Sequence, residues 1–267
     1  MKRTIIFLLI IIFLAACNNR NHQDSIFKDK NLERAVRKSL NYNDDQKIYE
    51  KDLDSIKQID CTRCSDLSGL KYLHNLKILC FGGCRIDDFS ELSELKALKT
   101  LSITNCKLND ISFLNRLNTV EYLYLEDNRI KDISSIESLK QLKEINISHN
   151  YIKDISVLSK LPYIEKIIMY DNLVEQLPDF SYCVNLKELD LQHNSLVCNK
   201  NFYNLKHVKE IWFAANKIDK INWVTSLDSI RYINMRDNPI NCNEVYKNIE
   251  MRKLIAKEIL VLDCDKR

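Results

Sequence analysis

Four cysteines near the start of the chain have a spacing that could support metal or redox chemistry. "CTRC" at residues 61–64 is followed by Cys80 and Cys84, which gives the pattern C-x2-C-x15-C-x3-C. Four thiolates at such a spacing are close to a structural zinc site. A Cys64–Cys84 disulfide and small buried side chains are the alternatives. The choice depends on whether the elements that carry these residues bring the sulfur atoms together.

A second group of residues combines histidine with aspartate. His149, Asp171 and His193 follow one another at intervals of 22 residues, and two imidazoles beside a carboxylate could hold a divalent ion. Polar residues are common at this place in repeats of the kind described below, so we predict neither a metal nor a cofactor. The sequence contains no nucleophile elbow, phosphate loop or recognisable triad, and we expect no catalytic activity.

The first residues predict export and lipidation. A basic pair at residues 2–3 precedes an apolar run over residues 5–14, as in a secretory signal peptide. The run is too short to cross a bilayer, which takes about 20 residues. The ending "LAAC" resembles a bacterial lipobox, which implies a signal peptide over residues 1–16, lipid attachment at Cys17 and a tether over residues 17–25. A plain signal peptide with a chance cysteine is the alternative.

The lipobox resemblance implies a location in the bacterial cell envelope, lipid-anchored in the outer membrane or at the cell surface. Diacylation supplies the two membrane signals that stable anchoring needs. The net charge of +3 falls to about +1 once the basic pair of the signal segment is removed. A nucleic-acid binder would carry a strong basic excess on one face, so we expect no nucleic-acid partner.

A strict period organises most of the chain. "LYLEDNRIKDIS" from Leu123 returns as "INISHNYIKDIS" from Ile145. Asparagines mark the same place in six successive copies, each 22 residues after the last: Asn128, Asn150, Asn172, Asn194, Asn216 and Asn238. Cys106 and Cys84 hold this place in the two preceding copies, which makes eight consecutive turns. Apolar residues at fixed phases of a strict period indicate a solenoid.

The pattern L-x-x-L-x-L-x-x-N assigns an element to each part of a turn. Its alternating apolar residues predict a short strand with one buried face, and strands stacked in register form a parallel sheet. The asparagine amide can bond to nearby backbone groups where the chain leaves the strand, so stacked asparagines form a ladder. The "DIS" segment that follows then returns along the other side in short helical or irregular turns.

This pattern resembles the leucine-rich repeat family, and most closely bacterial internalin-like proteins. The resemblance implies an α/β solenoid with a curved parallel sheet on the concave face and 3-10 or irregular turns on the convex side. Repeats over residues 56–240 would lie between a helical N-terminal cap over residues 26–55 and a C-terminal cap over residues 241–267, which closes the open core. Apolar residues at helical spacing support both caps: Leu32, Ala35, Val36 and Leu40 in the first, and Val245, Ile249 and Ile259 in the second.

The register separates the alternatives for the first cysteines. Cys61 takes a buried strand position, Cys64 and Cys84 lie in the ladder column with Cys106, and Cys80 points to the exposed face. We therefore favour small buried residues in place of ladder asparagines over a zinc site, and leave a Cys64–Cys84 disulfide open.

Near the C-terminus, "NPINCN" resembles the start of C-terminal caps in extracellular leucine-rich repeat proteins. This resemblance implies a Cys242–Cys264 disulfide, which the oxidising envelope permits. Trp223 falls on the convex side, where it either packs over the return segment or marks a second contact.

Repeat folds of this type bind partners on the concave sheet face. The register predicts that six large side chains share this face: Tyr122, Tyr124, Ile168, Tyr170, Trp212 and Tyr232. Four carboxylates lie among them: Glu144, Glu188, Asp190 and Glu210. Tryptophan and tyrosine are typical hot-spot residues, and carboxylates favour a basic partner. Scattered surface aromatic residues are also ordinary, which is the alternative reading.

The sequence therefore predicts a membrane-anchored surface lipoprotein that binds a protein partner with a basic patch through its concave face. The internalin resemblance implies a role in adhesion or host interaction. The alternative function is a structural or scaffolding envelope lipoprotein with a bacterial partner.

Overall fold

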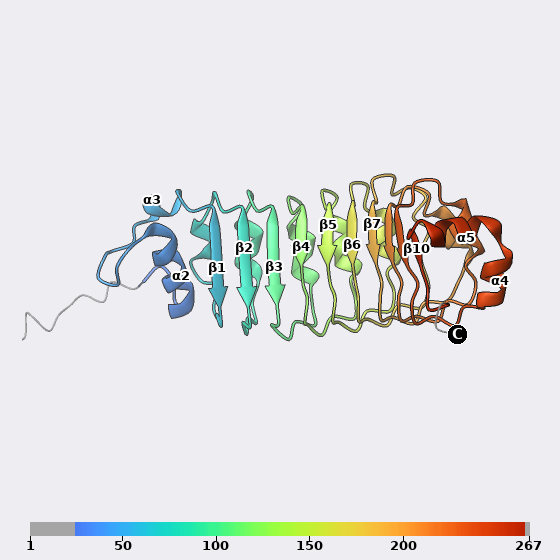
Figure 1. Cartoon of the computed structure of the whole chain (residues 1–267). Helices are drawn as coiled ribbons and strands as arrows, with labels where there is room; N and C mark the ends of the chain where they lie inside the picture. Colours follow the sequence, from blue (N-terminus) through green and yellow to red (C-terminus); the bar gives the residue numbers. More distant parts are fainter. Residues whose placement is uncertain (1–24, 265–267) are drawn as a thin grey trace, which may run out of the picture.

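A helical cap opens the described part of the chain, which is residues 25–264 of a computed structural model (Figure 1). Helix α2 (Lys30–Leu40) is capped by Asp29, whose Oδ1 accepts hydrogen bonds from two backbone amides of the first turn at 2.7 and 3.0 Å. A short helix, α3 (Glu50–Leu53), follows. The predicted apolar face of α2 is confirmed, because Leu32, Ala35 and Val36 are buried. The signal peptide, Cys17 and residues 18–24 lie outside the described residues.

Ten parallel strands in sequence order form one sheet. They are β1 (Gln58–Thr62), β2 (Ile78–Gly82), β3 (Thr100–Thr104), β4 (Tyr122–Tyr124), β5 (Glu144–Asn146), β6 (Lys166–Ile168), β7 (Glu188–Asp190), β8 (Glu210–Trp212), β9 (Tyr232–Asn234) and β10 (Leu260–Val261). From β2 to β9 each residue pairs with the residue 22 positions later, as in Leu123 with Ile145. The predicted strand phase is confirmed, since Leu123 and Ile145 are fully buried between half-exposed neighbours.

The asparagine ladder closes each turn with side-chain hydrogen bonds. The Nδ2 of Asn150 donates to the carbonyls of Leu125, Ile147 and Ser148 at 3.0–3.1 Å, and its Oδ1 accepts from the amide of Ile130 at 2.9 Å. These bonds satisfy polar backbone groups that water cannot reach. The residue before each ladder position has a positive φ, and in eight of the nine described turns it is not glycine.

The convex side consists of 3-10 turns, as predicted. They are η1 (Leu70–Tyr72), η2 (Ser90–Glu94), η3 (Ser112–Arg116), η4 (Ser134–Ser138), η5 (Ser156–Lys160), η6 (Lys200–Asn204) and η7 (Asn222–Ser226). In η2 to η5 the repeated Asp-x-Ser explains where the turn begins, because the aspartate carboxylate accepts from the serine amide, as Asp132 does from Ser134 at 2.8 Å. Such Asx contacts favour the start of a helical turn.

Trp223 belongs to the core and makes no second contact surface. Its side chain is fully buried, and its Nε1 donates to the carbonyl of Lys220 at 3.1 Å. The ring packs edge-on against Phe202, with centroids 5.0 Å apart, and lies close to Phe213. Of the two alternatives for this residue, packing over the return segment is the correct one.

The C-terminal cap contains α4 (Cys242–Lys247), α5 (Ile249–Ala256) and the final strand β10, which pairs with β9. A disulfide joins Cys242 at the start of α4 to Cys264 after β10. Val245 is buried as the helical pattern predicts, but the assignment of Ile249 to the inner face is wrong, because 59% of it is exposed. The helical conformation is interrupted at Asn248, between α4 and α5. The spacing that places Val245 on a buried face therefore does not continue into α5.

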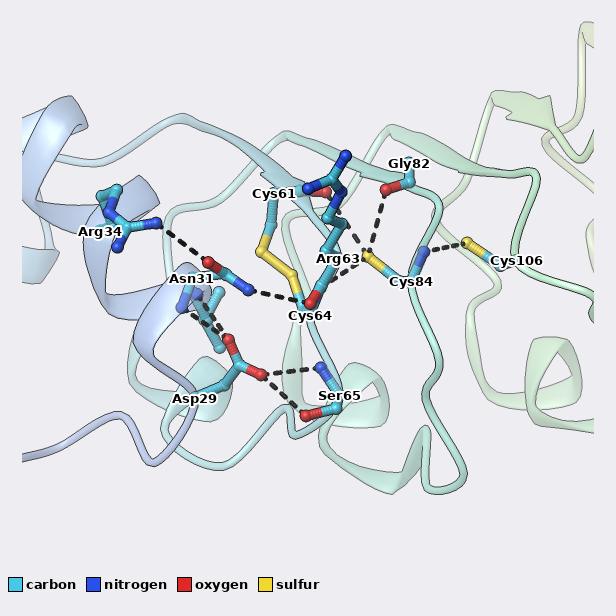
Figure 2. Close-up of a disulfide and its surroundings, with 11 residues drawn as sticks. Asp29, Asn31, Arg34, Cys61, Arg63, Cys64, Ser65, Gly82, Cys84 and Cys106 are labelled. Carbon is cyan, nitrogen blue, oxygen red and sulfur yellow. Dashed lines mark hydrogen bonds between the residues drawn. A yellow bond between two sulfur atoms is a disulfide. The ribbon is translucent and has the colours of Figure 1, made fainter.

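The cysteines of the first turns also differ from prediction (Figure 2). Cys61 and Cys64 are joined in a disulfide, so the Cys64–Cys84 bridge is wrong. The reason is the left-handed turn at Arg63, with φ of 58°, which directs Cys64 back toward its neighbour. The ladder role is confirmed, because the Sγ of Cys84 accepts from the amide of Cys64 and the Sγ of Cys106 from that of Cys84, both at 3.2 Å.

In the part of the chain that the structure describes, no helix has the length and apolar character needed to cross a bilayer.

Candidate binding surface on the concave face

The exposed side chains of β4–β9, which we call the concave surface, stand in two rows fixed by the strand register. The first row contains Tyr122, Glu144, Lys166, Glu188, Glu210 and Tyr232. The second contains Tyr124, Asn146, Ile168, Asp190, Trp212 and Asn234. Every member is half-buried, because its neighbours on the adjacent strands cover its flanks. All the strand residues predicted for this face therefore lie on it.

The aromatic residues divide into two groups on this face. Trp212 and Tyr232 touch across β8 and β9, with ring centroids 5.9 Å apart. Tyr122 and Tyr124 lie on β4, four strands before β8, which places them roughly 19 Å away at the usual strand spacing. Ile168 on β6 stands between the groups. A partner that contacts both groups must therefore span most of the concave surface.

Carboxylates fill much of the space between the aromatic groups. The Nζ of Lys166 lies 2.7 Å from Glu188, and this hydrogen bond raises the pKa of the lysine. Burial raises the pKa of Asp190, although hydrogen bonds from Gln192 oppose the shift. The two rows contain four carboxylates, Glu144, Glu188, Asp190 and Glu210, but one cation, Lys166, so the concave surface has a net negative charge.

The β4 end of the surface is held by polar contacts between neighbouring strands. The hydroxyl of Tyr124 donates to Glu144 at 3.3 Å, and burial together with this carboxylate raises the pKa of Tyr124 to about 12. The Nδ2 of Asn146 donates to Oε1 of Glu126 at 2.7 Å, whereas Oε2 of Glu126 is buried without a hydrogen-bond partner. Burial raises the pKa of Glu126 accordingly.

Tyr170 lies just beyond the end of β6, where His149 holds its hydroxyl. The Nε2 of His149 is 2.8 Å from this hydroxyl, and its Nδ1 is 2.7 Å from Oδ2 of Asp171. An imidazole with its proton on Nδ1 donates to Asp171 and accepts from Tyr170. His193 is not part of this arrangement, and no three histidine, cysteine, aspartate or glutamate side chains among residues 25–264 are grouped to hold a metal.

Sequence reasoning missed two contributors to this surface. Lys166 lies in the register column of Glu144 and Glu188, so its pairing with Glu188 was within reach of the repeat pattern alone. The contact between Asn146 and Glu126 crosses from one column to the next, and no periodic signal indicates it.

The repeat geometry and the capped sheet define a class of protein, and comparison with known proteins agrees. A model of the leucine-rich repeats family, in two copies, matches residues 74–116 and 118–160. A model of the prokaryotic membrane lipoprotein lipid attachment site matches residues 1–18. The chain is thus a leucine-rich repeat protein that carries a prokaryotic lipoprotein attachment site at its N-terminus.

Solved internalin structures from Listeria monocytogenes share the fold. Internalin F matches with a TM-score of 0.71 and 22% identity, over 89% of this chain and 76% of that chain. Internalin C2 matches with a TM-score of 0.63 and 20% identity, over 89% and 94% of the two chains. InlP matches with a TM-score of 0.66 and 18% identity, over 89% and 69%. No curated protein sequence matches this chain.

Proposed function

We propose that this lipid-anchored protein binds a protein partner through the concave surface and catalyses no reaction. The observation that carries the proposal is the pairing of two aromatic groups with an acidic centre on one rigid sheet face. Aromatic side chains on a rigid scaffold contribute contact area at low entropic cost, which is why they dominate binding energies. The partner meets the cell from outside, in adhesion or host interaction.

The charge of the surface supports a basic patch on that partner. Glu144, Glu188 and Glu210 stand in the same row, and only Lys166 interrupts them. Like charges at this spacing repel one another, and a cationic side chain placed between them relieves that repulsion. Electrostatic complementarity of this kind accelerates association and excludes wrongly charged partners.

Site-specific crosslinking on living cells tests the proposal. A photo-reactive amino acid replaces Ile168 at the centre of the concave surface, and in a matched control it replaces Tyr182, which is 84% exposed between β6 and β7. We expect a protein adduct from position 168 and none from position 182. Host cells and the protein's own envelope are offered separately, so the adduct also identifies where the partner resides. An adduct from position 182 alone would refute the proposal.

A further inference from the structure

A second polar site lies at the N-terminal end of the solenoid, on the strands that precede β4 and its two tyrosines and far from Trp212 and Tyr232. A surface hollow of about 750 Å³ opens where β1, β2 and β3 end. Four cationic side chains line it, and we call it the basic hollow: Arg34 of α2, and Arg63, Arg85 and Lys107 of three successive turns. No carboxylate is among the residues that line it.

The local structure brings these cations together. The Nδ2 of Asn31 donates to the carbonyl of Arg63 at 2.9 Å, and the guanidinium of Arg34 donates to Oδ1 of Asn31 at 3.0 Å (Figure 2). Asn31 thereby ties α2 to the first turn. The amide of Arg85 donates to the carbonyl of Cys64 at 2.9 Å, which stacks the second turn on the first.

The cations of the basic hollow are not neutralised by the protein. Other lysines of the solenoid form salt bridges, such as Lys99 and Lys143 with Glu121, but none of the four does so within residues 25–264. A nearby carboxylate, Asp29, is buried and already accepts from the first turn of α2 and from Ser65. Four uncompensated cations around one concavity attract anions.

Two glycines create the space between the cations. Gly82 and Gly83 line the hollow, although the chain has only three glycines. Backbone conformation does not require Gly83, whose φ is 63°, because Asp127 and Ala215 adopt the same conformation in equivalent turns. Packing does not require it either, since an added Cβ would meet no atom within 4 Å. At Gly82 the nearest contact would be an ordinary 3.7 Å. The pair thus leaves open the volume that side chains fill in other turns.

We propose that the basic hollow binds a phosphate group, and that this phosphate belongs to an anionic phospholipid of the anchoring membrane. Arginine presents a planar fork of donors that matches phosphate oxygens. The lipobox cysteine stands eight residues before Ser25. Eight residues span at most about 28 Å, so Ser25 lies within that distance of the lipid attachment point at Cys17. Basic residues near such a surface are drawn to its anionic lipids. The acidic concave surface, by contrast, is repelled by the same lipids.

Vesicle binding of the mature chain with Cys17→Ser tests this inference, because the substitution removes the lipid and lies outside the described fold. Vesicles of phosphatidylglycerol with phosphatidylcholine are compared with vesicles of phosphatidylcholine alone, and we expect binding to the former only. Each basic residue near an anionic surface contributes roughly fivefold in partitioning, so Arg63→Gln with Arg85→Gln lowers it about 25-fold. The control pair, Lys206→Gln with Lys220→Gln, removes equal charge from exposed sites at the other end and changes partitioning less than about twofold.

Substitution of Gly83 tests whether the open space of the basic hollow matters in addition to its charge. Gly83→Asp fills the space with a carboxylate and lowers partitioning at least fivefold on the same scale, whereas Gly83→Asn fills it without charge and has a smaller effect. Equal losses in the two double variants, or equal binding to both vesicle types, would overturn the inference. If glycerol phosphate binds to the hollow in a titration but the vesicles do not bind, the membrane source is refuted and the phosphate is a soluble one.

Discussion

Removal of one ladder side chain tests the solenoid at the point where its hydrogen bonds are most concentrated. Asn150 is 5% exposed and bonds to three carbonyls and one amide. After Asn150→Ala each of the three carbonyls still accepts a hydrogen bond from another donor. The carbonyl of Leu125 accepts from the side-chain amide of Asn128, and that of Ile147 accepts from the side-chain amide of Asn172. The carbonyl of Ser148 accepts from the backbone amide of Asp127. The buried amide of Ile130 alone loses its partner.

The expected loss in the free energy of unfolding follows from this one unpaired amide. An unpaired buried donor costs about 1–3 kcal/mol, and the lost side-chain contacts cost about 1 kcal/mol more. We expect Asn150→Ala to lower the free energy of unfolding by about 3 kcal/mol. The control is Asn185→Ala, which removes a solvent-accessible bond to the carbonyl of Pro162 at 3.1 Å and costs about 1 kcal/mol or less.

Urea unfolding followed by circular dichroism measures both variants against the parent chain. A loss for Asn150→Ala no larger than that for Asn185→Ala would show that the ladder does not stabilise the turns, and the reasoning from the ladder would fail.

Three further predictions concern stability. Burial raises the native pKa of Asp190 above 3.8, so ionisation of this side chain lowers the stability of the fold as the pH rises through that pKa. Asp190→Asn should therefore raise Tm at pH 7 and have no effect on Tm below about pH 3.5. Burial alone would raise the pKa of Asp29, but hydrogen bonds from Leu32 and Ser65 outweigh it and lower the pKa. Asp29→Ala should therefore reduce the free energy of unfolding by about 1–2 kcal/mol at pH 7, and this loss should fade in titrations below pH 3.8. Cys242→Ser with Cys264→Ser opens a loop with sequence separation 22 and should cost about 3 kcal/mol in urea unfolding; an unchanged midpoint would contradict it.

The periodic part of the molecule could be predicted because each turn repeats one physical solution. An apolar residue at a strand phase is buried in every turn, so the position of Ile145 or Leu123 fixes the face of its neighbours. The same logic placed Trp212 and Tyr232 on one surface and Cys84 in the ladder. Because eight copies share one pattern, an ambiguous position in one turn can be assigned from the same position in the other turns.

Features without a period escaped prediction for physical reasons. Strand β10 pairs 27 residues after β9, because α4 and α5 replace the usual return segment. The Cys61–Cys64 disulfide joins an inner strand position to the ladder position of the same turn, and no other turn of the repeat carries cysteine at both positions. The basic hollow requires the glycine pair and the approach of α2, and this contact between cap and repeats is visible only in three dimensions.

The central claim is that the concave surface is where a protein partner binds, and a titration with the crosslinked partner tests it most directly. A buried tryptophan hot spot contributes about 2 kcal/mol or more, which raises Kd roughly 30-fold when it is lost. We predict this rise for Trp212→Ala and a change below about twofold for Tyr182→Ala, with both variants folded as the parent chain is. Unchanged affinity in the folded Trp212→Ala variant would contradict the account.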